Sequence, residues 1–129
     1  MNKEFIQEVI DTLPPHLARG YMAEYDIIRG ETCRCILGHL FIKCGGNEVD
    51  IFNRSFWKHY TNENRVIEKL GVTKGDLIGL LTVNDQIASD DVRPKAVKAA
   101  LQILLDTGTL EDVLPIIQEY DPKGIWNYA

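Results

Sequence analysis

Residues 31–46 read ETCRCILGHLFIKCGG, and they contain the one expected helix that is apolar on nearly every side. Thr32 offers a hydroxyl suited to capping a helix N-terminus, and Gly45 with Gly46 is typical of a helix that ends in a left-handed turn. At about 100° per residue, apolar side chains fall on one broad face and also on the opposite face. Such a helix packs against neighbours on two sides. The sequence therefore predicts a central buried helix over about residues 32–45.

Further helices are expected before and after this segment, because apolar residues recur there at helical spacing. They are expected over residues 2–13, 62–70, 74–88, 90 or 91 to 107, and 110–120. In the last of these, Pro115 would kink the helix or shift its start to Asp112. Residues 23–31 show no sustained period and are expected to form a loop, and no strand is expected. The sequence predicts an all-α fold, a single compact domain of five to seven helices over residues 1–129. Residues 121–129 are expected to form an apolar C-terminal tail.

Composition limits the classes of protein to which the chain can belong. It has 129 residues, of which 45% are hydrophobic, and it lacks both a long apolar run and the features of a signal peptide. Its three cysteines are an odd number and favour a reducing, cytoplasmic location. With 19 acidic and 14 basic residues the net charge is −5, which disfavours nonspecific nucleic-acid binding. We therefore expect a cytoplasmic protein with no membrane segment.

Three short motifs give the chain a resemblance to a known group of proteins. The motifs are Cys35-Ile36-Leu37-Gly38-His39-Leu40, Asn84-Asp85 and Val97-Lys98-Ala99-Ala100-Leu101. Over residues 32–105 the chain resembles small uncharacterised helical domains of bacterial and phage open reading frames. These domains share a Cys-x-x-Gly-x-Leu helix start, a later Asn-Asp pair in a helix and an alanine-rich helix. The resemblance implies a helical fold and a bacterial or phage origin, and it implies no activity.

Cys35 and His39 are four residues apart and would share one face of the central helix. They are open to two interpretations. A cysteine in the first turn of a helix has a lowered pKa, so the pair could be a catalytic thiolate and imidazole. Alternatively, Cys35 is a buried core residue and His39 lies at the edge of the helix. No metal site is expected, because Cys33 and Cys35 would point about 200° apart on a helix, and no cofactor is expected.

Asn84 lies in line with Leu77 and Leu81 on the apolar stripe of its expected helix, so a polar amide is placed among core residues. A buried amide needs partners, and unpaired backbone groups at a neighbouring helix terminus are the natural ones. We favour a structural role for Asn84. The alternative is a ligand pocket formed by Cys35, His39, Asn84 and Asp85.

Two further segments combine aromatic residues in a way that suits binding. The first mixes bases and aromatics, as protein hot spots and stacking surfaces do, through Arg54, Trp57, Lys58 and Tyr60. The alternative is that these aromatics belong to the core and the bases to its rim. The second segment is the tail, which carries Trp126 and Tyr128. We expect Trp126 to pack back onto the helical body, with insertion into a partner as the alternative.

These features favour a small non-enzymatic protein, a phage or bacterial accessory factor that acts by binding another protein. The first alternative is a small-molecule or nucleotide-binding protein that uses the pocket near Cys35 and the Asn84-Asp85 pair. The second is a cysteine-dependent enzyme. Nucleic acid is not an expected partner, and homo-oligomers are compatible with the sequence.

Overall fold

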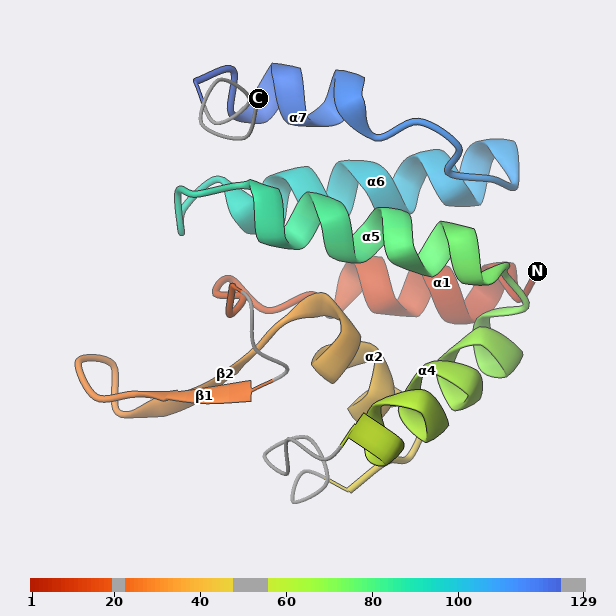
Figure 1. The fold of residues 1–129 in the computed structure, drawn as a ribbon, viewed down its shortest axis with the longest axis horizontal. Coiled ribbons are helices and arrows are strands. Elements are labelled where there is room, and N and C mark those ends of the chain that lie inside the picture. Colours follow the sequence, from red (N-terminus) through yellow and green to blue (C-terminus); the bar gives the residue numbers. More distant parts are fainter. Residues whose placement is uncertain (20–22, 48–55, 124–129) are drawn as a thin grey trace.

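The computed structural model describes residues 1–19, 23–47 and 56–123. Within these ranges the chain forms helices and one two-stranded hairpin: α1 (Lys3–Asp11), β1 (Ala23–Asp26), β2 (Glu31–Arg34), α2 (Ile36–Lys43), α4 (Phe56–Leu70), α5 (Lys74–Gln86), α6 (Arg93–Thr107) and α7 (Leu114–Tyr120). The helices dominate, which confirms the expected all-α compact fold (Figure 1). None of the described helices combines the length and apolar character needed to cross a bilayer.

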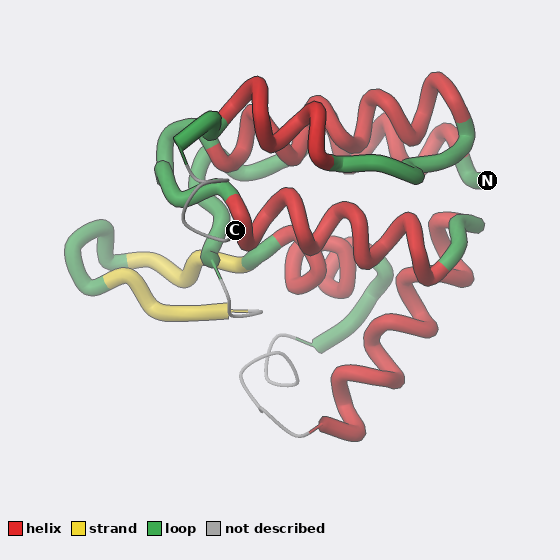
Figure 2. The backbone as a smooth tube through the Cα atoms, turned by 45° about the horizontal axis from the view of Figure 1, so that its top comes forward, coloured by secondary structure: helices red, strands yellow, loops and turns green. Residues whose placement is uncertain are grey.

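The helices pack around one core to which every described helix contributes. Helix α6 packs against α5, α1 and α7, and α2 packs against α4 and α5. In Figures 1 and 2 the axes of α5, α6 and α7 run side by side, whereas α4 lies at one side of the molecule and runs obliquely to them. The hairpin extends from the same body and leads directly into α2.

The central helix is buried as expected, but it begins later than the sequence suggested. Every residue from Ile36 to Phe41 is buried. The expected cap Thr32 lies instead in β2, and Cys35 is the N-cap, with its Sγ accepting a hydrogen bond from Gly38 N at 3.4 Å. The chain therefore enters α2 from an extended strand, which fixes the direction in which the hairpin leaves the body.

The end of α2 agrees with the sequence. Gly45 has a φ of 86° and donates to Ile42 O at 3.0 Å, and Gly46 N donates to Phe41 O at 2.9 Å. These two bonds form the Schellman motif, which satisfies carbonyls that a helix end otherwise leaves unpaired. A Cβ atom at Gly46 would overlap the Phe41 ring, so the second glycine is required as well as the first.

The expected loop at residues 23–31 is wrong, because β1 pairs there with β2 in an antiparallel hairpin. The register pairs Ala23 with Arg34 and Asp26 with Glu31, leaving a four-residue turn over residues 27–30. Gly30 takes a φ of 66°, the left-handed conformation that closes such turns. The chain thus carries a strand pair in a segment for which the sequence indicated irregular structure.

Helix α5 begins with a capping box that also connects it to the segment before α7. Thr73 Oγ1 accepts from Asp76 N, and Asp76 Oδ2 accepts from Thr73 N, both at 3.1 Å. Asp76 Oδ1 in addition accepts from Leu110 N at 2.9 Å. Burial alone would raise the pKa of Asp76, but the hydrogen bonds to Leu110 and Thr73 outweigh it and leave that pKa lowered. The carboxylate is therefore the stable form in the folded protein.

Candidate interaction site at the hairpin

Arg93, the first residue of α6, is the largest buried polar side chain of the described chain and is only 1% exposed. Its Nε donates to Ile87 O at 3.1 Å, its Nη2 to Ala88 O at 3.2 Å and its Nη1 to Leu17 O at 2.7 Å. Nη1 also pairs with the exposed carboxylate of Asp90 at 2.9 Å. A cation in the first turn opposes the helix dipole, so this position is explained by the three carbonyls that it satisfies.

Asn84 of α5 is completely buried and makes three hydrogen bonds. Its Oδ1 accepts from Ile36 N, the first amide of α2, at 3.0 Å. Its Nδ2 donates to Ala18 O at 2.8 Å and to Asp85 Oδ1 at 3.0 Å. Both amide hydrogens are therefore used within the fold. The structural role expected from the sequence is confirmed, including the backbone group at a neighbouring helix terminus.

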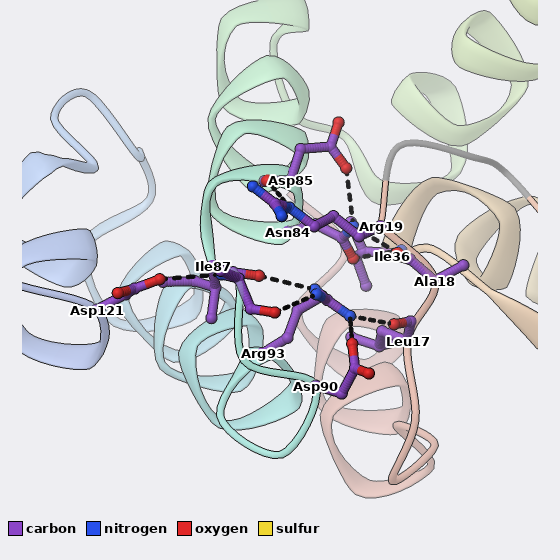
Figure 3. A network of polar contacts seen from close by, with 11 residues as sticks. Leu17, Ala18, Arg19, Ile36, Asn84, Asp85, Ile87, Asp90, Arg93 and Asp121 are labelled. Atoms are coloured by element: carbon purple, nitrogen blue, oxygen red, sulfur yellow. Dashed lines mark hydrogen bonds and ion pairs between the residues drawn. The ribbon is translucent and has the colours of Figure 1, made fainter. Parts of the chain in front are cut away.

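Together these side chains hold the base of the hairpin (Figure 3). Arg93 binds Leu17 O, and Asn84 binds Ala18 O. The same short segment also pairs with β2, because Ala18 N donates to Arg34 O at 3.0 Å. Arg19 Nε adds a bond of 2.7 Å to Asp85 O. We call this set of contacts the polar junction. It links α5, α6 and residues 17–19 to the strand from which the hairpin extends.

The far end of the hairpin carries apolar side chains in water. Ile27 is 86% exposed and Ile28 is 98% exposed, and both lie in the turn. Tyr25 on β1 is also exposed. Figures 1 and 2 show the turn projecting away from the helices. We call residues 27–30 the hairpin tip; the sequence does not indicate it, because residues 23–31 were expected to form a loop.

The environment of Cys35 disfavours ionisation of its thiol. Burial raises the pKa of its thiol to about 11, although the hydrogen bond from Gly38 N acts in the opposite direction. At neutral pH the group is therefore a thiol, whereas nucleophilic cysteines work as thiolates. The lowered pKa expected for a cysteine at a helix start is wrong here, because desolvation exceeds the effect of the helix amides.

His39 is 6% exposed and does not pair with Cys35. Its Nε2 has no hydrogen-bond partner among the residues that the structure describes. Burial, followed by the nearby charges of Lys43 and Arg34, lowers the pKa of His39 to about 4. The ring is thus neutral in the folded protein near neutral pH. It is buried in the core, whereas the sequence suggested a position at the edge of the helix.

This buried ring makes stability depend on pH. The unfolded chain binds a proton at His39 below pH 6.5, whereas the folded chain does not until about pH 4. The free energy of unfolding is expected to fall by about 3 kcal/mol between these values and then to level off. Urea unfolding at a series of pH values from 7 to 4 measures this fall in the free energy of unfolding. His39→Leu is the control, because it removes the titrating ring and with it the pH dependence. Parallel pH profiles for parent and variant would show that His39 is not the titrating group.

The other residues singled out in the sequence fall in different places. Helix α4 includes Trp57, Lys58 and Tyr60, but the structure describes only the backbone of these residues and not their side chains. Arg54, Trp126 and Tyr128 are entirely outside it, as are the tail residues 124–129. Their roles stay predictions. No group of three His, Cys, Asp or Glu residues suited to a metal ion occurs in the described ranges.

A small cavity of about 110 Å³ lies beside β2, next to Pro14, His16 and Cys33. Ligand sites usually measure about 300–1,000 Å³, so this space suits a few water molecules better than a metabolite. Asn84, one of the four residues of the alternative ligand pocket, does not line this cavity and is buried in the polar junction.

The hairpin with its buried base and apolar tip is thus the feature of the described chain that calls for a functional explanation. No protein-family model matches the chain, and no curated protein or solved structure matches it significantly, so its function is inferred from this geometry.

Proposed function

We propose that the chain is a small cytoplasmic, non-enzymatic accessory protein of bacterial or phage origin that binds another protein through the hairpin tip. The observation that carries the proposal is the exposure of Ile27 and Ile28, 86% and 98%, at the end of a projecting arm. Two adjacent exposed isoleucines at the end of such an arm are suited to insertion into an apolar pocket of a partner.

Local structure gives no reason for isoleucine at these positions. Turns prefer Gly, Asn, Asp, Ser and Pro, which supply special backbone angles or local hydrogen bonds. The turn already has Gly30 in the left-handed conformation, so a polar residue at position 27 or 28 would serve it at least as well. Burial of each isoleucine in a partner would contribute about 1.5–3 kcal/mol. The apolar tip is therefore better explained by binding than by folding.

The polar junction supports this role by fixing the arm before a partner arrives. Arg93 and Asn84 bind Leu17 O and Ala18 O, and Ala18 N binds Arg34 O in β2. A binding element that is ordered in the free protein loses less conformational entropy on association than a disordered one. The buried hydrogen bonds thereby favour affinity without touching the partner.

The experiment compares affinity capture from cells of the native host by the tagged parent protein and by Ile28→Asp. A carboxylate cannot enter an apolar pocket without a large desolvation penalty. The amount of partner captured by the variant is therefore expected to fall by about 10-fold or more. The matched control is Ile78→Asp, which places the same charge at a half-exposed isoleucine of α5. Equal loss in both variants, or none in Ile28→Asp, would contradict the proposal.

A further inference from the structure

The chain carries a second surface feature, and its charge is opposite to the net charge of the hairpin segment. A shallow cavity of about 360 Å³ lies between α6 and α7, lined by Ala99, Tyr120, Gln102 and two exposed lysines, Lys95 and Lys98. No carboxylate is among its lining residues. The cavity is therefore an apolar depression with a positively charged rim.

The hairpin has the complementary character. Its tip presents Ile27 and Ile28, and the register places two acidic residues, Asp26 and Glu31, opposite each other where the turn begins and ends. From residue 24 to residue 31 the sequence has three acidic residues and one basic residue, a net charge of −2. An exposed apolar turn in a segment of net negative charge complements an apolar depression lined by lysines, because opposite charges steer such contacts.

We propose that the hairpin tip of one copy of this chain docks into the α6–α7 cavity of a second copy. This inference rests on the proposed function, since it assigns the tip a partner of known chemistry. Within one molecule the two isoleucines are exposed and do not fill the cavity of their own chain. The contact joins two different surfaces, so reciprocal docking gives a closed dimer and one-way docking gives a ring or a chain.

The size of the contact predicts weak, concentration-dependent association. A single arm in a shallow cavity buries less surface than the roughly 1,200–2,000 Å² of a standard stable interface. Self-association is therefore expected at micromolar to millimolar concentrations and is expected to weaken with added salt, because exposed lysines and carboxylates are screened.

Sedimentation velocity over a concentration series tests the inference with a complementation design. Ile28→Asp disables the tip and keeps the cavity, whereas Lys98→Glu disables the rim of the cavity and keeps the tip. Each variant alone is expected to raise the dissociation constant of self-association by about 10-fold or more. An equimolar mixture retains one intact tip and one intact cavity, so it is expected to form a 1:1 heterodimer. Unchanged circular dichroism and melting temperature establish that both surface variants are folded.

A parent protein that stays monomeric at all concentrations, or a mixture that fails to form the heterodimer, would overturn the inference. Ile78→Asp is the control and is expected to associate like the parent. If the parent is monomeric but Ile28→Asp still loses a different captured protein, the inference fails and the proposed function stands. If Ile28→Asp loses neither self-association nor a captured partner, the proposed function fails as well.

Discussion

Replacing Arg93 by methionine is expected to lower the free energy of unfolding by about 3–5 kcal/mol, the largest effect of any single substitution considered for this chain. Methionine fills much of the same volume but has no donor. Leu17 O and Ile87 O, which accept from Arg93 in the buried interior, would lose a charged donor without gaining water. Urea denaturation measures the loss.

The matched control for this substitution is Asp90→Asn. Asp90 pairs with Arg93 at 2.9 Å, but its side chain is 68% exposed, so the ion pair is screened and the expected loss is below about 1 kcal/mol. Arg93→Lys should fall between the two, since one ammonium group cannot reproduce the planar set of donors. A loss below about 1 kcal/mol in Arg93→Met would show that the carbonyls are satisfied in another way.

Asn84→Ala is expected to cost about 2–3 kcal/mol, because it leaves Ile36 N and Ala18 O buried without their partners. Asn84→Asp separates the two halves of the interaction. It keeps an acceptor for Ile36 N but loses the donor to Ala18 O, and it places a second carboxylate beside Asp85. Its deficit relative to the parent should therefore be larger at pH 7 than in acid, where a protonated carboxyl can donate again.

Thr82→Ala is the control on the same helix. Thr82 Oγ1 donates to Ile78 O at an exposed position, so its removal is expected to change the free energy of unfolding by less than about 0.5 kcal/mol. Chemical denaturation of both variants under one set of conditions gives the comparison. Equal stabilities for Asn84→Ala and Thr82→Ala would mean that the polar junction does not stabilise the fold.

The helices were largely predictable because their signals are local and repeated. Gly45, Gly71 and Gly108 end α2, α4 and α6 in left-handed turns, and Thr73 caps α5, all as the sequence indicates. Asn84 was predictable as well, since a polar residue on an apolar stripe at helical spacing must be buried with partners. These features depend on neighbours within a turn or two of helix.

Arg93 was missed although the same reasoning applies to it. It lies in helical register with Val97, Ala100 and Leu104, all buried on the face that packs against the core. Arginine is mostly exposed in folded proteins, so the sequence does not single out Arg93 as a core residue. Its partners are the carbonyl of Leu17, 76 positions away in the sequence, and the carbonyl of Ile87 at the end of α5. No local sequence pattern predicts contacts of this kind.

The hairpin was missed because its pattern is short and merges with the helix that follows. Buried Cys33 and Cys35 alternate with partly exposed Thr32 and Arg34, which is a strand period of two over only four residues. When the segment is drawn as a helix, the same cysteines fall on its two opposite apolar faces, one on each. Pairing with residues 23–26 decides between these conformations, and the sequence of residues 31–46 does not contain that information.

Site-specific photo-crosslinking in cells tests most directly whether the hairpin tip is the binding surface. A photoreactive diazirine amino acid is placed at position 28 in one sample and at position 78, also an exposed isoleucine in the parent, in another. We expect a discrete covalent protein adduct from position 28 and none of comparable yield from position 78. Adducts of equal yield from both positions, or none from position 28 at matched expression, would contradict the assignment of the tip as the interface.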